Sequence, residues 1–148
     1  MSVIDRVLQG QEAEKAAMTL RQAAATVLVA AVTSDDGVAP QERTRLIAQL
    51  STMRIYRQAS AEDLQAIMGA ATAAVAQYGT EELLTACATA IPEELRAAIF
   101  ALAVELVFVD GRVTEREKRF VDALQAALEI DDATAMSVVR VLLIKSRA

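Results

Sequence analysis

Hydrophobic positions along this chain recur with the spacing of helices that turn one face toward a core. Leu46, Leu50 and Met53 follow an i, i+4, i+7 rhythm, which indicates an amphipathic helix over 40–53. Proline at its first position and glutamate shortly after are typical of a helix start. Comparable stripes, caps and breakers predict further helices over 2–10, 11–34 (as one long or two abutting helices), 60–77, 80–91, 92–109, 114–128 and 132–145.

Two of these segments are apolar on every face. Residues 23–32 contain no charged residue, and residues 97–109 contain one, Glu105. Helices that are hydrophobic all round lie at the centre of a fold, so both are expected to be buried. Both fall short of the ~20 residues that span a bilayer, and charges interrupt the start of the chain, which does not resemble a signal peptide. We therefore expect a cytoplasmic protein without membrane insertion.

Composition points to tightly packed helices. Hydrophobic residues make up 54% of the 148 residues, only 3% are aromatic, and there are five glycines and two prolines. Much of the apolar content is alanine, which favours helix and lets helix axes approach closely. The predicted fold class is all-α, a compact bundle of about seven to eight helices that forms one domain over 1–148.

Charge and missing residue types exclude several functions. The net charge is −5, and lysines and arginines form no basic stripe, so nucleic acid is not an expected partner. Histidine is absent, which removes the commonest catalytic base and zinc ligand. The single cysteine, Cys87, lies in an apolar context and is expected in the core. No catalytic constellation remains, and the chain is predicted not to be an enzyme.

The chain contains an internal repeat at a shift of 75 residues. In each copy an apolar helix is followed by an acidic turn, a valine, and a glutamate in the first turn of an amphipathic helix. The repeat halves cover roughly 16–78 and 91–148, and pseudo-twofold packing of these halves would bring the two acidic turns together. Asp35 aligns with Asp110, Val38 with Val113, Glu42 with Glu117, Leu46 with Val121, Met53 with Leu128 and Ile55 with Ile130.

This repeated element resembles that of the tellurite-resistance TerB family, in which an apolar helix end is followed by D-G-x-[VI]-x-x-x-E. The second copy, from Asp110-Gly111 to Glu117, fits well, whereas the glycine of the first copy, Gly37, is displaced by one place. The resemblance implies a compact helical domain associated with tellurite and other chemical stress, with an acidic metal-binding surface. TerB-like domains are also attached to a membrane-anchored J-domain co-chaperone, which implies use as an interaction module.

The acidic residues of the two copies are candidate metal ligands. Neither copy is an EF-hand, because the first and third loop positions would be Leu106 and Phe108 in the second copy. Oxygen ligands from both turns would suit calcium, magnesium or manganese, and zinc is less favoured because histidine is absent. The candidate set, including the isolated Glu105 of the apolar segment, is Asp35, Asp36, Glu42, Glu105, Asp110 and Glu117.

Each of these residues also has a purely structural explanation. Glu42 and Glu117 stand where helix-capping carboxylates stand, and aspartates favour turns. Glu105 needs solvent, a basic partner, a proton or an ion, because an unpaired buried carboxylate costs several kcal/mol. The leading hypothesis is a divalent-metal-binding stress-response domain with protein partners. Its rivals are a metal-independent scaffold that binds proteins through a hydrophobic groove and, more weakly, a carboxylate-metal enzyme. The oligomeric state stays open.

Overall fold

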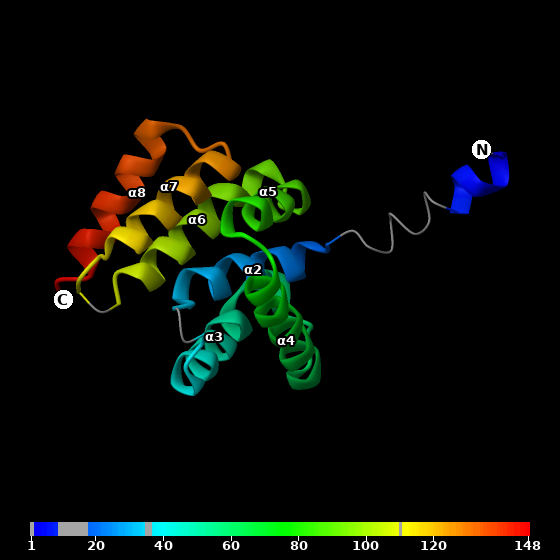
Figure 1. Ribbon diagram of the computed structural model, residues 1–148. Helices are drawn as coiled ribbons and strands as arrows, with labels where there is room; N and C mark the ends of the chain where they lie inside the picture. The colour runs from blue at the N-terminus through cyan, green and yellow to red at the C-terminus, as the bar shows by residue number, and fades with distance from the viewer. Residues whose placement is uncertain (1, 9–17, 35–36, 110) are drawn as a thin grey trace.

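The computed structural model describes residues 2–8, 18–34, 37–109 and 111–148, and regular structure within these ranges is helical. The predicted all-α class is confirmed. Residues 3–8 form a short helix, which Figure 1 draws apart from the bundle. The other elements are α2 (Leu20–Val32), α3 (Pro40–Thr52), the 3-10 turn η1 (Arg54–Tyr56), α4 (Ala61–Gln77), α5 (Thr80–Ala90), α6 (Glu93–Val107), α7 (Glu115–Ala127) and α8 (Asp132–Lys145).

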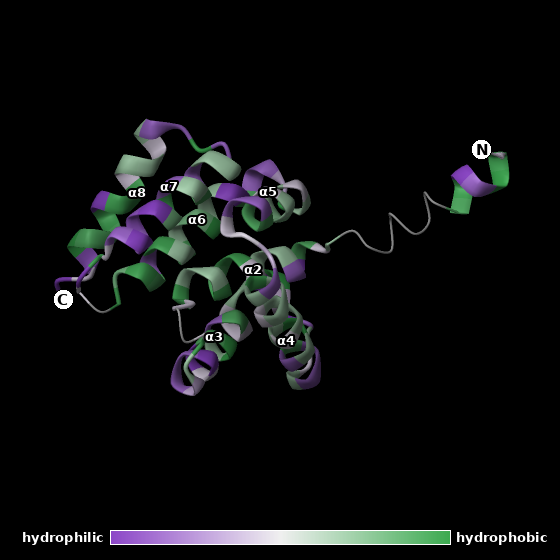
Figure 2. Cartoon of the chain, viewed as in Figure 1, coloured by the Kyte–Doolittle hydropathy of each residue, from purple (hydrophilic) through white to green (hydrophobic). Residues whose placement is uncertain are grey.

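Helix α2 is the centre of the bundle. It packs against α3, α4, α5 and α6, and Figure 1 shows it between the α3–α4 pair and the group α6, α7 and α8. Its residues from Ala23 to Val29 are buried, as the apolar pattern predicted. Figure 2 shows the hydrophobic colouring along most of α2 and α6. Three consecutive alanines at 23–25 allow neighbouring helices to approach closely on several sides.

The start of α2 differs from the prediction. Thr19 is extended and caps the helix, with its hydroxyl accepting from the Gln22 amide at 3.1 Å and the Gln22 side chain accepting from the Thr19 amide at 3.0 Å. Of the two alternatives predicted for 11–34, the single long helix is wrong because α2 begins at Leu20. The alternative of two abutting helices stays a prediction, because residues 11–17 lie outside the described residues. This T-x-x-Q capping box is visible in the sequence, but the surrounding helix-favouring residues obscured it.

Helix bounds follow the predicted repeat closely. α2 ends at Val32 and α6 at Val107, while α3 starts at Pro40 and α7 at Glu115, so each pair is separated by 75 residues. Each copy thus has an apolar helix, a turn of the same overall length, and a 13-residue helix. The pseudo-twofold relation between the halves remains a prediction.

Both turns use a glycine with positive φ. Gly37 has φ +85° and Gly111 has φ +72°, values that side-chain-bearing residues rarely adopt. The Gly37 amide donates to the Ser34 carbonyl at 3.0 Å, and the Gly111 amide donates to the Phe108 carbonyl at 3.1 Å. The glycine that is displaced by one place in the sequence alignment therefore has the same local role in both copies.

Helix α8 leaves part of its hydrophobic surface exposed. Met136 is 60% exposed and Leu143 is 42% exposed. α8 packs mainly on α6, and its side toward α7 is open. The residues that face the core are Ala135, Val138, Val139 and Leu142.

A buried tyrosine ties α2 to the segment that follows α3. The Tyr56 hydroxyl donates to the Arg21 carbonyl at 2.5 Å, and the Arg21 guanidinium donates through Nε to the Ile55 carbonyl at 2.8 Å. Burial raises the pKa of Tyr56 well above its ordinary value, so the phenol stays protonated and remains a donor.

Tyr56→Phe should lower the free energy of unfolding by about 1–2 kcal/mol, because the Arg21 carbonyl then loses its buried donor while packing is retained. Urea denaturation followed by circular dichroism measures the change. Tyr78→Phe is the matched control, since Tyr78 is half exposed, and it should change stability by less than about 0.5 kcal/mol. Equal effects of the two substitutions would contradict this role for the Tyr56 hydroxyl.

Candidate functional site

The structure describes three of the six candidate carboxylates. Glu42, Glu105 and Glu117 are in α3, α6 and α7 respectively. Asp35, Asp36 and Asp110 lie outside the described residues, so their part in a metal site remains a prediction.

Glu117 takes part in the N-terminal cap of α7. The Thr114 hydroxyl accepts from the Glu117 amide at 3.1 Å, and the Glu117 carboxylate accepts from the Thr114 amide at 3.2 Å. This reciprocal pair is a capping box, and it confirms the expectation that Glu117 caps its helix. One carboxylate oxygen of Glu117 is thereby engaged in holding the helix end.

Glu42 has no equivalent cap. The residue before α3 is Ala39, which offers no side-chain hydrogen bond. The Glu42 side chain instead borders a small cavity of about 20 Å³ whose other walls include Val32, Leu106 and Val109. Val109 directly precedes Asp110 in the chain, so the glutamate of the first copy lies next to the residue that leads into the second acidic turn.

Glu105 forms an ion pair with Lys145 of α8. Pairing with a basic residue was one of the outcomes expected for this isolated carboxylate, and it is confirmed. The Glu105 side chain is also partly exposed, so the carboxylate is not desolvated at the centre of an apolar helix. With Phe108, Val109 and Lys145 it lines a second cavity, at the carboxyl end of α6.

Val109 lines both cavities, and Glu42 lines one of them while Glu105 lines the other. Two carboxylates supply fewer oxygens than the six to eight that calcium takes. Within 2–8, 18–34, 37–109 and 111–148, no three Asp, Glu, Cys or His side chains form a group that could hold a metal ion. A complete site would therefore require the aspartates of the turns.

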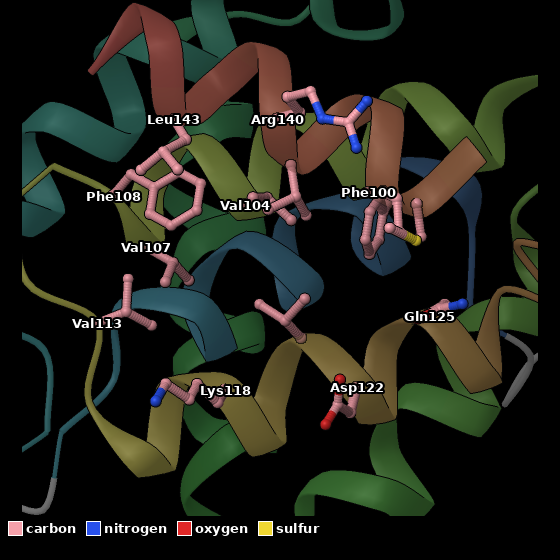
Figure 3. Close-up of a pocket in the computed structure, with 14 residues that line it drawn as sticks. Phe100, Val104, Val107, Phe108, Val113, Lys118, Asp122, Gln125, Arg140 and Leu143 are labelled. Atoms are coloured by element: carbon pink, nitrogen blue, oxygen red, sulfur yellow. The ribbon is translucent and has the colours of Figure 1, made fainter. Parts of the chain in front are cut away.

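An apolar groove of about 640 Å³ lies between α7 and α8, with α6 as its floor (Figure 3). Phe108 and Leu143 lie at one end and Phe100 at the other, while Val104 lies on the floor between them. We call this cavity the α7–α8 groove. Its lining residues are Phe100, Val104, Val107, Phe108, Val113, Lys118, Val121, Asp122, Gln125, Ala135, Met136, Val139, Arg140 and Leu143.

Charged side chains stand only at the edges of the α7–α8 groove. Figure 3 shows Lys118 and Asp122 on the α7 side and Arg140 on the α8 side. Neither Asp122 nor Arg140 makes an ion pair with another residue of the described chain. An apolar floor between charged edges suits a ligand with an apolar face and polar flanks.

Sequence reasoning named a hydrophobic groove only as part of a rival hypothesis and did not place it at Met136 and Leu143. Their helical positions differ by seven residues, so both lie on one face of α8, but periodicity cannot show whether a neighbour covers that face. α7 packs on α5 and α6, and α8 packs on α6. The space between α7 and α8 follows from these separate attachments.

Cys87 is buried in α5, as predicted. Its Sγ lies 3.7 Å from the Met18 Sδ, and burial raises the pKa of the Cys87 thiol to about 11. The thiol therefore stays protonated at neutral pH and is a poor nucleophile.

The comparisons with known proteins identify one family. The sequence model described as "Tellurite resistance protein TerB" matches residues 21–138. This range covers α2 to α7 and the first half of α8. No curated protein and no solved structure matches the chain. Within the described residues, no helix has the length and apolar character needed to cross a membrane.

Thr114→Ala should destabilise the fold by about 1 kcal/mol, because it removes the acceptor for the first-turn amide of α7. Glu117→Gln should change stability by only a few tenths of a kcal/mol, since a glutamine side chain can still accept from the Thr114 amide. Chemical denaturation in chelator-treated buffer measures both. A large loss in Glu117→Gln would show that the charge, and not the cap, gives Glu117 its structural role.

Proposed function

Because the chain belongs to the TerB family of tellurite resistance proteins, we propose that it is a non-enzymatic stress-response domain that binds an amphipathic helix of a partner protein. The α7–α8 groove is the binding site. The observation that carries this proposal is a preformed apolar cavity of about 640 Å³ with charges confined to its edges.

Exposed hydrophobic residues at the α7–α8 groove support this function. Met136 and Leu143 remain accessible on α8, at 60% and 42% exposure. Contiguous apolar surface of this kind is costly in water and commonly marks a binding site. A partner helix would cover both side chains and exclude water from Val104 on the floor.

The dimensions also favour a helical ligand. Along α8 the groove extends from Ala135 to Leu143, which is roughly 12 Å at 1.5 Å per residue. That length holds about two turns of a helix, with apolar anchors spaced three and four residues apart.

Leu143→Glu should weaken binding of a synthetic Leu/Lys amphipathic helix by about tenfold or more, since it places an unpaired carboxylate in the groove. Ile144→Glu is the matched control, because Ile144 is also exposed on α8 but does not line the groove. Binding is followed by the methyl resonances of Val104, Val107 and Val139, which line the groove and are kept in both variants. No saturable binding to the natural protein, or equal weakening by both variants, would contradict the proposal.

A divalent metal site at the acidic turns is a second candidate function. It is favoured by the positions of Glu42 and Glu105, which each line a cavity that Val109 also lines. One carboxylate from each repeat thus lies near the residue that precedes the second acidic turn. Calcium, magnesium or manganese would be held by these oxygens together with those of Asp35, Asp36, Asp110 and Glu117. The Glu105–Lys145 ion pair would have to open or rearrange for Glu105 to bind the ion.

Calorimetric titration of chelator-treated protein with Ca²⁺, Mg²⁺, Mn²⁺ and Zn²⁺ tests the metal site. We expect one of the three hard cations to bind with a dissociation constant below about 1 mM, the weak end for protein calcium sites. Glu42→Gln and Glu117→Gln should each weaken it about tenfold, because a carboxylate ligand loses its charge. Absence of binding by all four ions, or unchanged affinity in both variants, would end the metal hypothesis.

A further inference from the structure

The chain has an amphipathic helix near its start whose hydrophobic side chains are not covered by the other described residues. Residues 3–8 are helical, and the helix is capped by Ser2, whose hydroxyl accepts from the Asp5 amide at 3.0 Å. The start of the opening helix predicted over 2–10 is confirmed, and its predicted end near Gly10 lies outside the described residues. Four of the six residues are large hydrophobics that are 52–71% exposed, namely Val3, Ile4, Val7 and Leu8.

These four side chains form a single stripe. Positions i, i+1, i+4 and i+5 lie within about 140° of one another around a helix. Asp5 and Arg6 lie on the opposite side of the helix. Asp5 lies beyond the Leu8 edge of the stripe, and Arg6 lies beyond the Val3 edge. Helices this short do not persist alone in water, because nucleation is costly and few hydrogen bonds offset it. A surface that covers the stripe is therefore required for residues 3–8 to stay helical.

The α7–α8 groove matches this helix in length and chemistry. Residues 2–8 extend roughly 10 Å as a helix, close to the roughly 12 Å between Ala135 and Leu143 along α8. The groove floor is apolar, and its edges carry Lys118 and Asp122 on α7 and Arg140 on α8. A helix with one acidic and one basic flank can place opposite charges at each of these edges.

Tether length allows the helix to reach the groove of its own chain. Nine residues, 9–17, separate the helix from Met18, and nine residues span at most about 30 Å. The radius of gyration expected for a folded chain of this size is only about 15 Å. Met18 is anchored on α5, and Arg96 links the carbonyls of Ala88 in α5 and Leu128 after α7, so the tether starts on the side where α7 ends.

We propose that residues 3–8 dock into the α7–α8 groove of the same chain and compete there with the partner helix. The proposal rests on the proposed function, in which this groove binds amphipathic helices. Tethering favours the chain's own segment over a second copy, because a short linker gives an effective concentration in the millimolar range. A partner must then displace the segment, which lowers its apparent affinity by the fraction of grooves that are occupied.

The test uses the full chain with Ile4→Glu, which places a charge in the middle of the stripe. Methyl resonances of Val104, Val139 and Leu143 should shift relative to the natural protein, because the segment leaves the groove. The synthetic Leu/Lys helix should bind about tenfold more tightly to this variant if the segment fills nine-tenths of the grooves. Val141→Glu is the control, since Val141 is exposed on α8 outside the groove, and it should change neither readout.

Three outcomes separate this inference from the proposed function. Unchanged groove methyls and peptide affinity in Ile4→Glu, with binding still sensitive to Leu143→Glu, overturn the docked segment and leave the proposed function intact. Failure of the peptide to bind either protein overturns the proposed function, and the methyl shifts alone then decide whether the segment docks. Methyl shifts that depend on protein concentration, together with a dimer in light scattering, overturn docking within the same chain.

Discussion

The burial of α2 is the constraint on which the rest of the structure depends. A helix without a polar face can be kept from water only if neighbours cover its whole circumference, and α3, α4, α5 and α6 do so. Alanines 23–25 make this enclosure possible because they add no bulk between the axes.

The α7–α8 groove follows from how the second apolar helix, α6, is covered. One side of α6 packs on α2, and its other sides are covered by α7 and α8. The last helix packs on α6, with its side facing α7 left open, and the α7–α8 groove results. The same attachment brings Lys145 to Glu105, so one packing event forms the groove wall and neutralises the isolated carboxylate of α6.

The acidic turns show how local and functional requirements can share residues. Glu117 holds the start of α7 through its capping box, which gives it a structural role regardless of any ion. Glu42 has no such bond at the start of α3 and lies instead beside Val109 of the other repeat. Two glutamates that align in the sequence therefore differ in structural role, since Glu117 is engaged in a helix cap and Glu42 is not.

The sequence by itself determined the local features of this protein. Hydrophobic periodicity, the caps at Ser60 and Thr114, and the glycines of both turns placed most helices within a residue or two, because helix starts and stops are decided by neighbouring residues. The repeat also identified the family. Tertiary structure alone decided that Lys145 pairs with Glu105, that Val109 lies beside Glu42, and that Met136 and Leu143 line a groove. These outcomes depend on which surfaces of distant helices meet, and periodicity records that a face is apolar without recording what covers it.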